Sequence, residues 1–151
     1  MPQFEEQGGE LLEEERWKKF KGTVRVALEV LNFERDQAKD LDVKQVIYLK
    51  ECFKDDACRR LELQNHIPAL IDHHLFATVA AASGISVEDL LDKKPPEYPE
   101  LVFPDGFKLK CLRGRHRIQA GREFLAPGDR WWTVDLYLSG KFCFLGEICI
   151  S

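Results

Sequence analysis

Apolar residues change their spacing from one segment to the next, and these changes predict alternating strands and helices. Residues 23–31 (TVRVALEVL) alternate between apolar and polar side chains with a period of two, which predicts a β-strand. A polar loop over residues 32–40 follows it. Asp42 then precedes apolar residues at helical spacing, so we expect a helix that Asp42 caps and that runs through Phe53. The buried side of this helix is predicted to hold Val43, Val46, Ile47, Leu49 and Phe53.

The second half of the chain continues the alternation. His66–Ile71 is a short apolar run typical of a strand, and Pro68 within it favours an edge position because proline cannot donate to a neighbouring strand. Trp131 and Trp132 are adjacent, so a strand there places one ring in the core and the other outside. The remaining elements are predicted as a helix over 75–82, a short helix over 86–91, a three-proline connector over 93–99, a strand over 107–112, a turn over 127–129 and a strand over 131–138.

Length and composition indicate one globular domain. The chain has 151 residues, of which 44% are hydrophobic and 32% charged, and a chain of this size can bury a sizeable core. Because strands and helices interleave, we expect an α+β or α/β domain. The predicted organisation is an N-terminal tail with an amphipathic helix (residues 1–21, the helix over 10–21), a domain over residues 22–138, and a divergent C-terminal strand or tail over residues 139–151.

The apolar stretches and the cysteines suggest a cellular compartment. No stretch reaches the ~18 apolar residues that span a bilayer, and the N-terminus lacks the basic and apolar regions of a secretory signal. We therefore expect an intracellular protein, in the nucleus or cytoplasm, with no membrane partner. The five cysteines form no C-x-x-C pair, so free thiols are expected. Cys111 falls within a predicted strand, and we expect it in the core.

Charge is distributed unevenly. The net charge is −4, yet residues 108–122 contain six lysines and arginines and no acid. Within that run, Gly114 can make the tight turn between a strand and a helix, and Arg115, His116 and Arg117 follow it at the helix start. Free backbone N–H groups and the helix dipole add positive character there. This combination predicts an anion site, most naturally for phosphate; the alternative is an exposed basic turn.

The apolar residues of this basic helix also share a face. Ile118, Ala120, Gly121 and Leu125 have the spacing of a buried helical side. A local basic patch on an acidic protein favours a specific anion over general coating by nucleic acid.

The segment Gly114-Arg-His-Arg-Ile-Gln-Ala120, entered by one strand and followed by another at residues 132–137, resembles the ParB/sulfiredoxin-like superfamily. Members of that superfamily begin a helix with a G-x-[HR]-R-x-x-A box. Longer phrases, such as residues 65–72 and 112–125, resemble a family of uncharacterised fungal proteins. The resemblance covers about residues 20–138. It implies an α+β fold, with a small mixed sheet flanked by helices.

The resemblance implies a nucleotide site. In the superfamily the box holds the phosphates of CTP or ATP, and we consider Mg²⁺ as their accompanying ion. The matching positions are Gly114, Arg115, His116 and Arg117. A Q-P-R triplet beside the nucleotide corresponds here to Gln37-Ala38-Lys39, so Lys39 stands in the place of an arginine. These features predict a nucleotide-binding domain, and we consider DNA and a second copy of the chain as further partners.

Departures from the superfamily keep other functions open. Sulfiredoxins carry a reactive cysteine directly before His-Arg, and this chain has Arg115 there, so reduction of sulfinic acids is not expected. The altered triplet and C-terminus suggest, as one alternative, an interaction or scaffold domain whose phosphate box is vestigial. A second alternative is a ParB-like nuclease, which would bind metal through carboxylates, or another enzyme that acts on nucleic acid through the same basic patch. The candidate acids of the nuclease are Asp55, Asp56, Asp129 and Asp135.

Histidines invite a comparison with metal sites. His73 and His74 lie beside Asp72, with His66 upstream. Neighbouring histidines point in different directions, and no helical His-x-x-x-His pair accompanies them. We therefore expect no metal site, and whether the protein is an enzyme stays open.

Overall fold

The computed structural model describes residues 19–33, 41–56 and 59–139. In these ranges the chain alternates between strands and helices and builds one mixed sheet, so the α+β class is confirmed. The elements are β1 (Phe20–Ala27), β2 (Leu31–Phe33), α3 (Val43–Asp56), β3 (Ile67–Ile71), α4 (His73–Ala82), β4 (Leu109–Cys111), α5 (Arg115–Phe124) and β5 (Trp131–Leu138).

The sheet has the strand order β1-β5-β3-β4-β2. β1 pairs with β5, and β3 with β4, in antiparallel fashion, whereas β3 with β5 and β2 with β4 are parallel. On the side of β1 that faces away from β5, the amide of Arg25 donates to the carbonyl of Pro99 at 2.8 Å. This arrangement places β2 at the free edge, beside α5.

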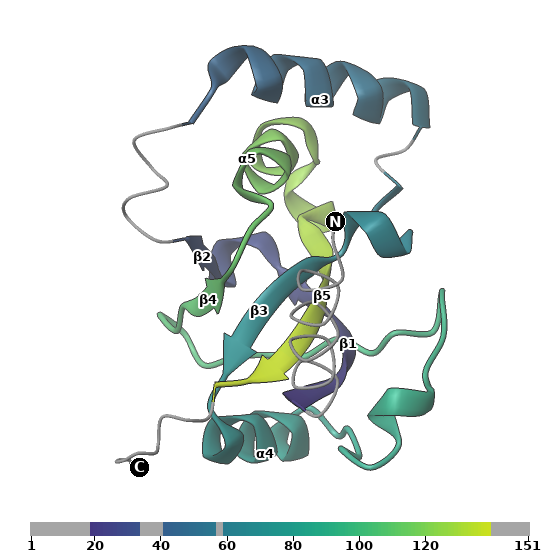
Figure 1. Cartoon of the computed structure of the whole chain (residues 1–151), viewed down its shortest axis with the longest axis vertical. Coiled ribbons are helices and arrows are strands. Elements are labelled where there is room, and N and C mark those ends of the chain that lie inside the picture. The colour runs from purple at the N-terminus through teal and green to yellow at the C-terminus, as the bar shows by residue number, and fades with distance from the viewer. Residues whose placement is uncertain (1–18, 34–40, 57–58, 140–151) are drawn as a thin grey trace, which may run out of the picture.

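The helices lie at two ends of the sheet (Figure 1). α3 crosses α5 at one end, and α4 lies at the opposite end. A single hydrophobic cluster joins these elements. At its centre the ring of Trp132 is fully buried, 5.7 Å from the ring of Phe53 on α3, and it also lies next to Gly121 of α5. The predicted inward face of α5 is confirmed by the burial of Ile118 and Ala120.

The strand predicted over residues 23–31 is wrong in its extent. β1 begins earlier, at Phe20, and ends at Ala27, and a 3₁₀ turn over Leu28–Val30 leads into β2. Leu28 and Val30 are buried in this turn, so the alternation of apolar residues persists while the backbone changes direction. Phe20 and Lys21 belong to β1 rather than to the expected N-terminal helix, because Phe20 pairs with Tyr137 of β5.

The helix predicted at Asp42 is confirmed, but its buried face is narrower than expected. The Lys44 amide donates to the Asp42 carboxylate at 3.0 Å, which is the predicted cap. Val43 and Ile47 are 64% and 51% exposed. The reason is that α3 packs mainly against α5, so only its inward side is covered. The residues buried on that side are Val46, Leu49 and Phe53.

The edge position predicted from Pro68 is wrong, since β3 is the central strand of the sheet. The paired residues of β3 and β4 are Ala69 with Cys111 and Leu70 with Lys110, so Pro68 lies just beyond them. Its carbonyl still accepts from the amide of Leu112 at 2.8 Å. A missing proline N–H is tolerated where the ladder ends.

Two further predictions are corrected in length. The strand expected over 107–112 is reduced to Leu109–Cys111. The short helix expected over 86–91 is replaced by a turn and a 3₁₀ segment, Leu90–Asp92. The predicted amphipathic helix up to residue 18 and the predicted C-terminal strand or tail from residue 140 onward lie outside the described residues.

Candidate functional site

Gly114 makes the turn from β4 into α5. Its backbone is left-handed, with φ 98°, and it caps the helix that begins at Arg115. A Cβ atom at this position would overlap Cδ1 of Ile67, a side chain buried in the core. Glycine is therefore required here both by the backbone angle and by the close approach of β3, which confirms the predicted turn.

His116 contacts another helix. Its Nε2 atom accepts a hydrogen bond at 2.8 Å from the backbone amide of Asp42, the residue that caps α3. An imidazole that accepts at Nε2 is neutral and carries its proton on Nδ1. This bond joins positions 74 residues apart in the chain, so the sequence pattern gave no sign of it.

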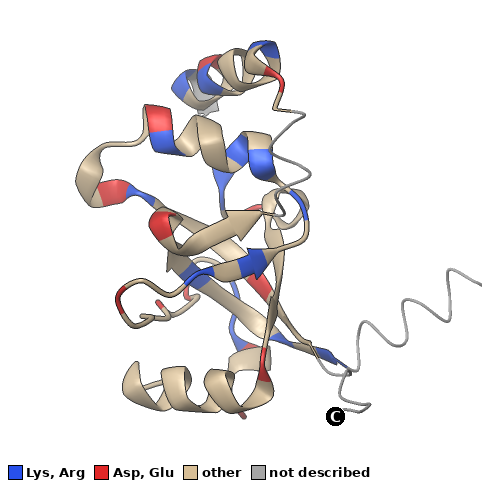
Figure 2. Cartoon of the chain, turned by 90° about the vertical axis from the view of Figure 1, so that its left-hand side faces the viewer, with Lys and Arg blue, Asp and Glu red and all other residues tan. Residues whose placement is uncertain are grey.

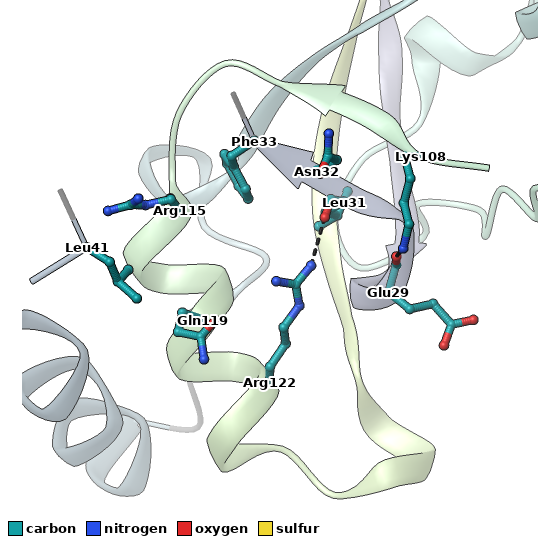
Figure 3. A pocket seen from close by; sticks show the side chains of 9 residues that line it. All are labelled: Glu29, Leu31, Asn32, Phe33, Leu41, Lys108, Arg115, Gln119 and Arg122. Atoms are coloured by element: carbon teal, nitrogen blue, oxygen red, sulfur yellow. Dashed lines mark hydrogen bonds between the residues drawn. The ribbon is translucent and has the colours of Figure 1, made fainter. Parts of the chain in front are cut away.

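A cavity of about 490 Å³ lies between α5 and β2 (Figure 3). We refer to it as the α5–β2 cavity. Among the described residues that line it, the cationic side chains are Lys108, Arg115 and Arg122, and the one carboxylate is that of Glu29. Figure 2 shows basic residues at the start of α5 and on β4, the strand that precedes it. The cavity therefore has a positive electrostatic character.

Two of these cations are held in place by backbone carbonyls. Arg122 donates through Nη2 to the carbonyls of Leu28, at 3.0 Å, and of Leu31, at 2.7 Å. Lys108 donates through Nζ to the carbonyl of Glu29 at 2.7 Å. A guanidinium has five N–H donors and an ammonium has three, so both groups retain donors for a ligand. Burial lowers the pKa of Arg122, but a guanidinium stays charged at neutral pH.

Arg115 differs from the other two cations. It is the first residue of α5 and extends on the side of the cavity where Leu41 lies (Figure 3). Its Nη1 atom is buried and has no acceptor among the described residues. A buried donor without an acceptor is costly. Among the three cations of the cavity lining, Arg115 is therefore the one for which a buried donor without an acceptor is recorded in the described residues.

The rest of the cavity wall is apolar or neutral. Leu31, Phe33 and Leu41 supply the apolar surface, and the ring of Phe33 lies near the start of α5. Asn32 and Gln119 supply amides; Gln119 uses its Nε2 atom to donate to Glu123 at 2.7 Å. This wall suits a ligand that combines a flat ring with anionic groups.

The basic residues of the predicted phosphate box occupy different environments in the structure. Arg115 lines the cavity, His116 binds the start of α3, and Arg117 is half-buried outside the cavity lining. Burial lowers the pKa of Arg117. The other two predicted residues, Gln37 and Lys39, lie outside the described residues.

Sequence reasoning did not assign Lys108 and Arg122 to the site. They lie in the basic run that was recognised, but only folding brings them to β2. The absence of acids over residues 108–122 was the one signal that could have included them.

The acids considered for a nuclease do not converge where they are described. Asp135 accepts from Thr23 and contacts His66, whereas Asp129 binds Arg60. The side chains of Asp55 and Asp56 lie outside the description. Within the described ranges no three His, Cys, Asp or Glu residues are grouped so that they could hold a metal ion. No described helix is both long and apolar enough to cross a membrane.

Comparison with known proteins places the chain in a family. Neither a curated protein nor a solved structure matches it. Residues 19–143 match a family described as "Protein of unknown function (DUF3723) N-terminal domain". This match spans β1 to β5 and thus includes every wall of the α5–β2 cavity. The chain therefore belongs to the DUF3723 family, whose N-terminal domain it contains.

Proposed function

We propose that the α5–β2 cavity binds a phosphate-bearing small molecule, and specifically a nucleotide. The observation that carries this proposal is that Arg115, whose buried Nη1 donor lacks an acceptor among the described residues, lines a cavity together with two further cations, Lys108 and Arg122. A phosphate group offers several charged acceptor oxygens, and hydrogen bonds between charged partners are the stronger ones.

The position of Arg115 supports an anion over a neutral ligand. Arg115 opens α5, where free backbone N–H groups and the helix dipole favour negative charge. Arg122 and Lys108 also line the cavity and are already oriented by carbonyl oxygens of the 28–31 segment. These cations are thus ordered before a ligand arrives, which reduces the entropy lost on binding.

The cavity's size and apolar wall support a nucleotide over free phosphate. About 490 Å³ falls within the usual range for small-molecule sites, well above the volume that a lone phosphate needs. The ring of Phe33 offers a surface on which a base can stack, and Asn32 offers an amide for its polar edge. The resemblance to ParB/sulfiredoxin-like proteins, whose box holds CTP or ATP, points to the same ligand class, with Mg²⁺ as its companion ion.

In this account the box residues have separate roles. Arg115 contacts the phosphates, whereas Gly114 and His116 set the position of α5 through Ile67 and Asp42. Arg117 receives no ligand contact.

A thermal-shift screen of ATP, CTP, GTP and UTP with Mg²⁺ tests the proposal. A nucleotide present at 100 times its Kd stabilises the fold by about 2.7 kcal/mol, enough to raise Tm by several degrees. We expect the shift to fall to about half or less in Arg115→Ala and to persist in full in Arg113→Ala. Arg113 is the matched control because it is an exposed arginine two positions away that does not line the cavity. A wild-type protein that no nucleotide shifts would contradict the proposal.

The second candidate is an interaction domain in which the phosphate box is vestigial. The observation that favours it is the bond from Asp42 to His116, which gives one residue of the box a purely structural role. Under this alternative the Arg115→Ala and Arg113→Ala variants behave alike in the nucleotide screen. DNA binding and nuclease activity gain no specific support from the described residues.

A further inference from the structure

His66 lies directly before β3, is buried, and does not line the α5–β2 cavity. Its side chain is only 1% exposed. It lies against β5, where its Nδ1 atom is 2.9 Å from Oδ1 of Asp135. Its Nε2 atom is 3.0 Å from the backbone carbonyl of Leu61. Neither contact belongs to the proposed nucleotide site.

Both ring nitrogens of His66 therefore face oxygen atoms that can only accept. A neutral imidazole has a single N–H group, so it would leave one of these two close contacts without a proton. The doubly protonated imidazolium satisfies both contacts. It also neutralises the carboxylate of Asp135, which would otherwise be a partly buried charge without a cation.

Three further side chains of the described residues lie near His66 and Asp135. From β1, the hydroxyl of Thr23 donates to the same Oδ1 atom of Asp135 at 2.8 Å. From the proline-rich connector, the ring of Tyr98 meets that of His66 edge-on at 5.6 Å. Arg25 of β1 is turned to the Tyr98 carbonyl, to which its Nε atom donates at 2.9 Å. Among the described residues, the cationic partner of the Asp135 carboxylate is therefore His66.

The charge of Asp135 also affects its neighbours. Burial alone would lower the pKa of His66, but the hydrogen bond and charge of Asp135 and the Leu61 carbonyl outweigh it, so the pKa lies above its ordinary value. Burial and the negative charge of Asp135 raise the pKa of Tyr98, which therefore stays neutral.

We propose that His66 is a buried imidazolium at pH 6.5 and acts as a pH-sensitive lock that joins the segment before β3 to β1 and β5. When His66 loses its proton, one of its two hydrogen bonds is lost and Asp135 remains without a cation. The contact between the segment that ends at His66 and strand β5 is then weaker, and the folded state is less stable.

The sign of the pH effect follows from the raised pKa. The folded protein holds a proton on His66 that the unfolded chain has already released above about pH 6.5. The stabilisation is therefore complete below that pH and is lost as the pH rises through the folded pKa. Over this window the unfolding equilibrium constant rises by up to about tenfold per pH unit.

The first test is a ¹⁵N NMR titration of the histidine rings in the full chain. His73, His74 and His116 are assigned by replacing each with Asn in turn, so that His66 itself stays intact. We expect both His66 ring nitrogens to be protonated at pH 6.5, with a titration midpoint above 6.5. A His66 ring with one unprotonated nitrogen at pH 6.5 would overturn the proposal.

The second test is urea unfolding between pH 6 and pH 9. We expect wild-type stability to fall across the NMR midpoint of His66 and Asp135→Asn to flatten this dependence. His74→Asn, which alters an exposed histidine of α4, should keep the wild-type slope. Wild-type stability that does not change across the His66 titration would refute the lock. The NMR result stands even if Asp135→Asn does not fold.

Discussion

The Nε2 atom of His116 lies 2.8 Å from the backbone nitrogen of Asp42, so the first turn of α5 is hydrogen-bonded to the cap of α3. Asp42 uses its own side chain to cap α3 by accepting from the Lys44 amide. The starts of the two helices are thereby fixed to each other. Because Arg115 is the residue next to His116, this bond also fixes one wall of the α5–β2 cavity.

Replacing His116 by Ala should therefore weaken the fold without abolishing ligand binding. Loss of one partly exposed hydrogen bond costs about 1 kcal/mol, which urea unfolding can resolve. His74→Ala, at an exposed position on α4, serves as the control and should change stability by less. If His116→Ala removed nucleotide binding while stability stayed at the wild-type level, His116 would be a ligand contact rather than a structural one.

Gly114→Ala should be among the most destabilising single changes in the domain. A left-handed backbone costs a non-glycine residue about 1 kcal/mol, and the new methyl group would force Ile67 to move within the packed core, which costs a further 1–3 kcal/mol. Gly106→Ala is the matched control, because its φ is 83° but no atom lies within 4 Å of the added Cβ. Urea unfolding of the two variants separates backbone strain from overlap.

The overlap has its own test. Ile67→Val removes the Cδ1 atom that the Gly114→Ala methyl group would meet. In the Ile67→Val background the penalty of Gly114→Ala should fall to that of Gly106→Ala. If Gly114→Ala lowered the free energy of unfolding equally in the wild-type and Ile67→Val backgrounds, the overlap with Ile67 would not be the cause of the destabilisation.

Arg122→Ala should destabilise the corner between β1 and β2. The guanidinium donates to the carbonyl of Leu28, the first residue of the 3₁₀ turn, and to that of Leu31, the residue that follows the turn. Hydrogen bonds to charged groups contribute about 1.5–3 kcal/mol. We expect a loss of about 2–3 kcal/mol by urea unfolding. Lys50→Ala, which removes an exposed ion pair with Glu123, should lose less than 1 kcal/mol. If Arg122→Ala and Lys50→Ala lowered the free energy of unfolding by similar amounts, the two hydrogen bonds of Arg122 would not stabilise this corner as expected.

The sequence predicts the elements better than their boundaries and neighbours. The strand at 131–138, the cap at Asp42 and the turn at Gly114 depend on local chemistry and are confirmed. The break after Ala27 and the central place of β3 are missed. The break and the central position both depend on which strands pair with each other. The alternation of apolar residues along one strand does not determine that pairing.

The candidate site shows the same limit. Arg115 is found from its place after Gly114, because a glycine-led helix start is a local feature. The involvement of Arg122 and Lys108 requires β2 to lie beside α5, and the use of His116 requires α3 to cross α5. Contacts between distant segments therefore decide which basic residues face the cavity.

Cys111 should resist alkylation in the folded protein. It is fully buried, as predicted, and burial raises the pKa of its thiol to about 12. At pH 8 it is almost entirely in the unreactive thiol form. Mass spectrometry after iodoacetamide treatment should find the peptide with Cys111 unmodified in native protein and modified in urea, whereas the partly exposed Cys52 should react faster in the native state. Native labelling of Cys111 at the rate of Cys52 would contradict its placement in the core.

The central claim is that Arg115 and the α5–β2 cavity bind a nucleotide. The most direct test is calorimetric titration of ATP and of CTP, each with Mg²⁺, into the wild type, Arg115→Ala and Arg113→Ala. Loss of a charge-assisted hydrogen bond of about 1.5–3 kcal/mol corresponds to a rise in Kd of roughly 10- to 150-fold. We expect the wild type to bind, Arg115→Ala to show this rise in Kd, and Arg113→Ala to keep a Kd within about twofold of that of the wild type. No binding heat with either nucleotide, or equal loss of affinity in both variants, would contradict it.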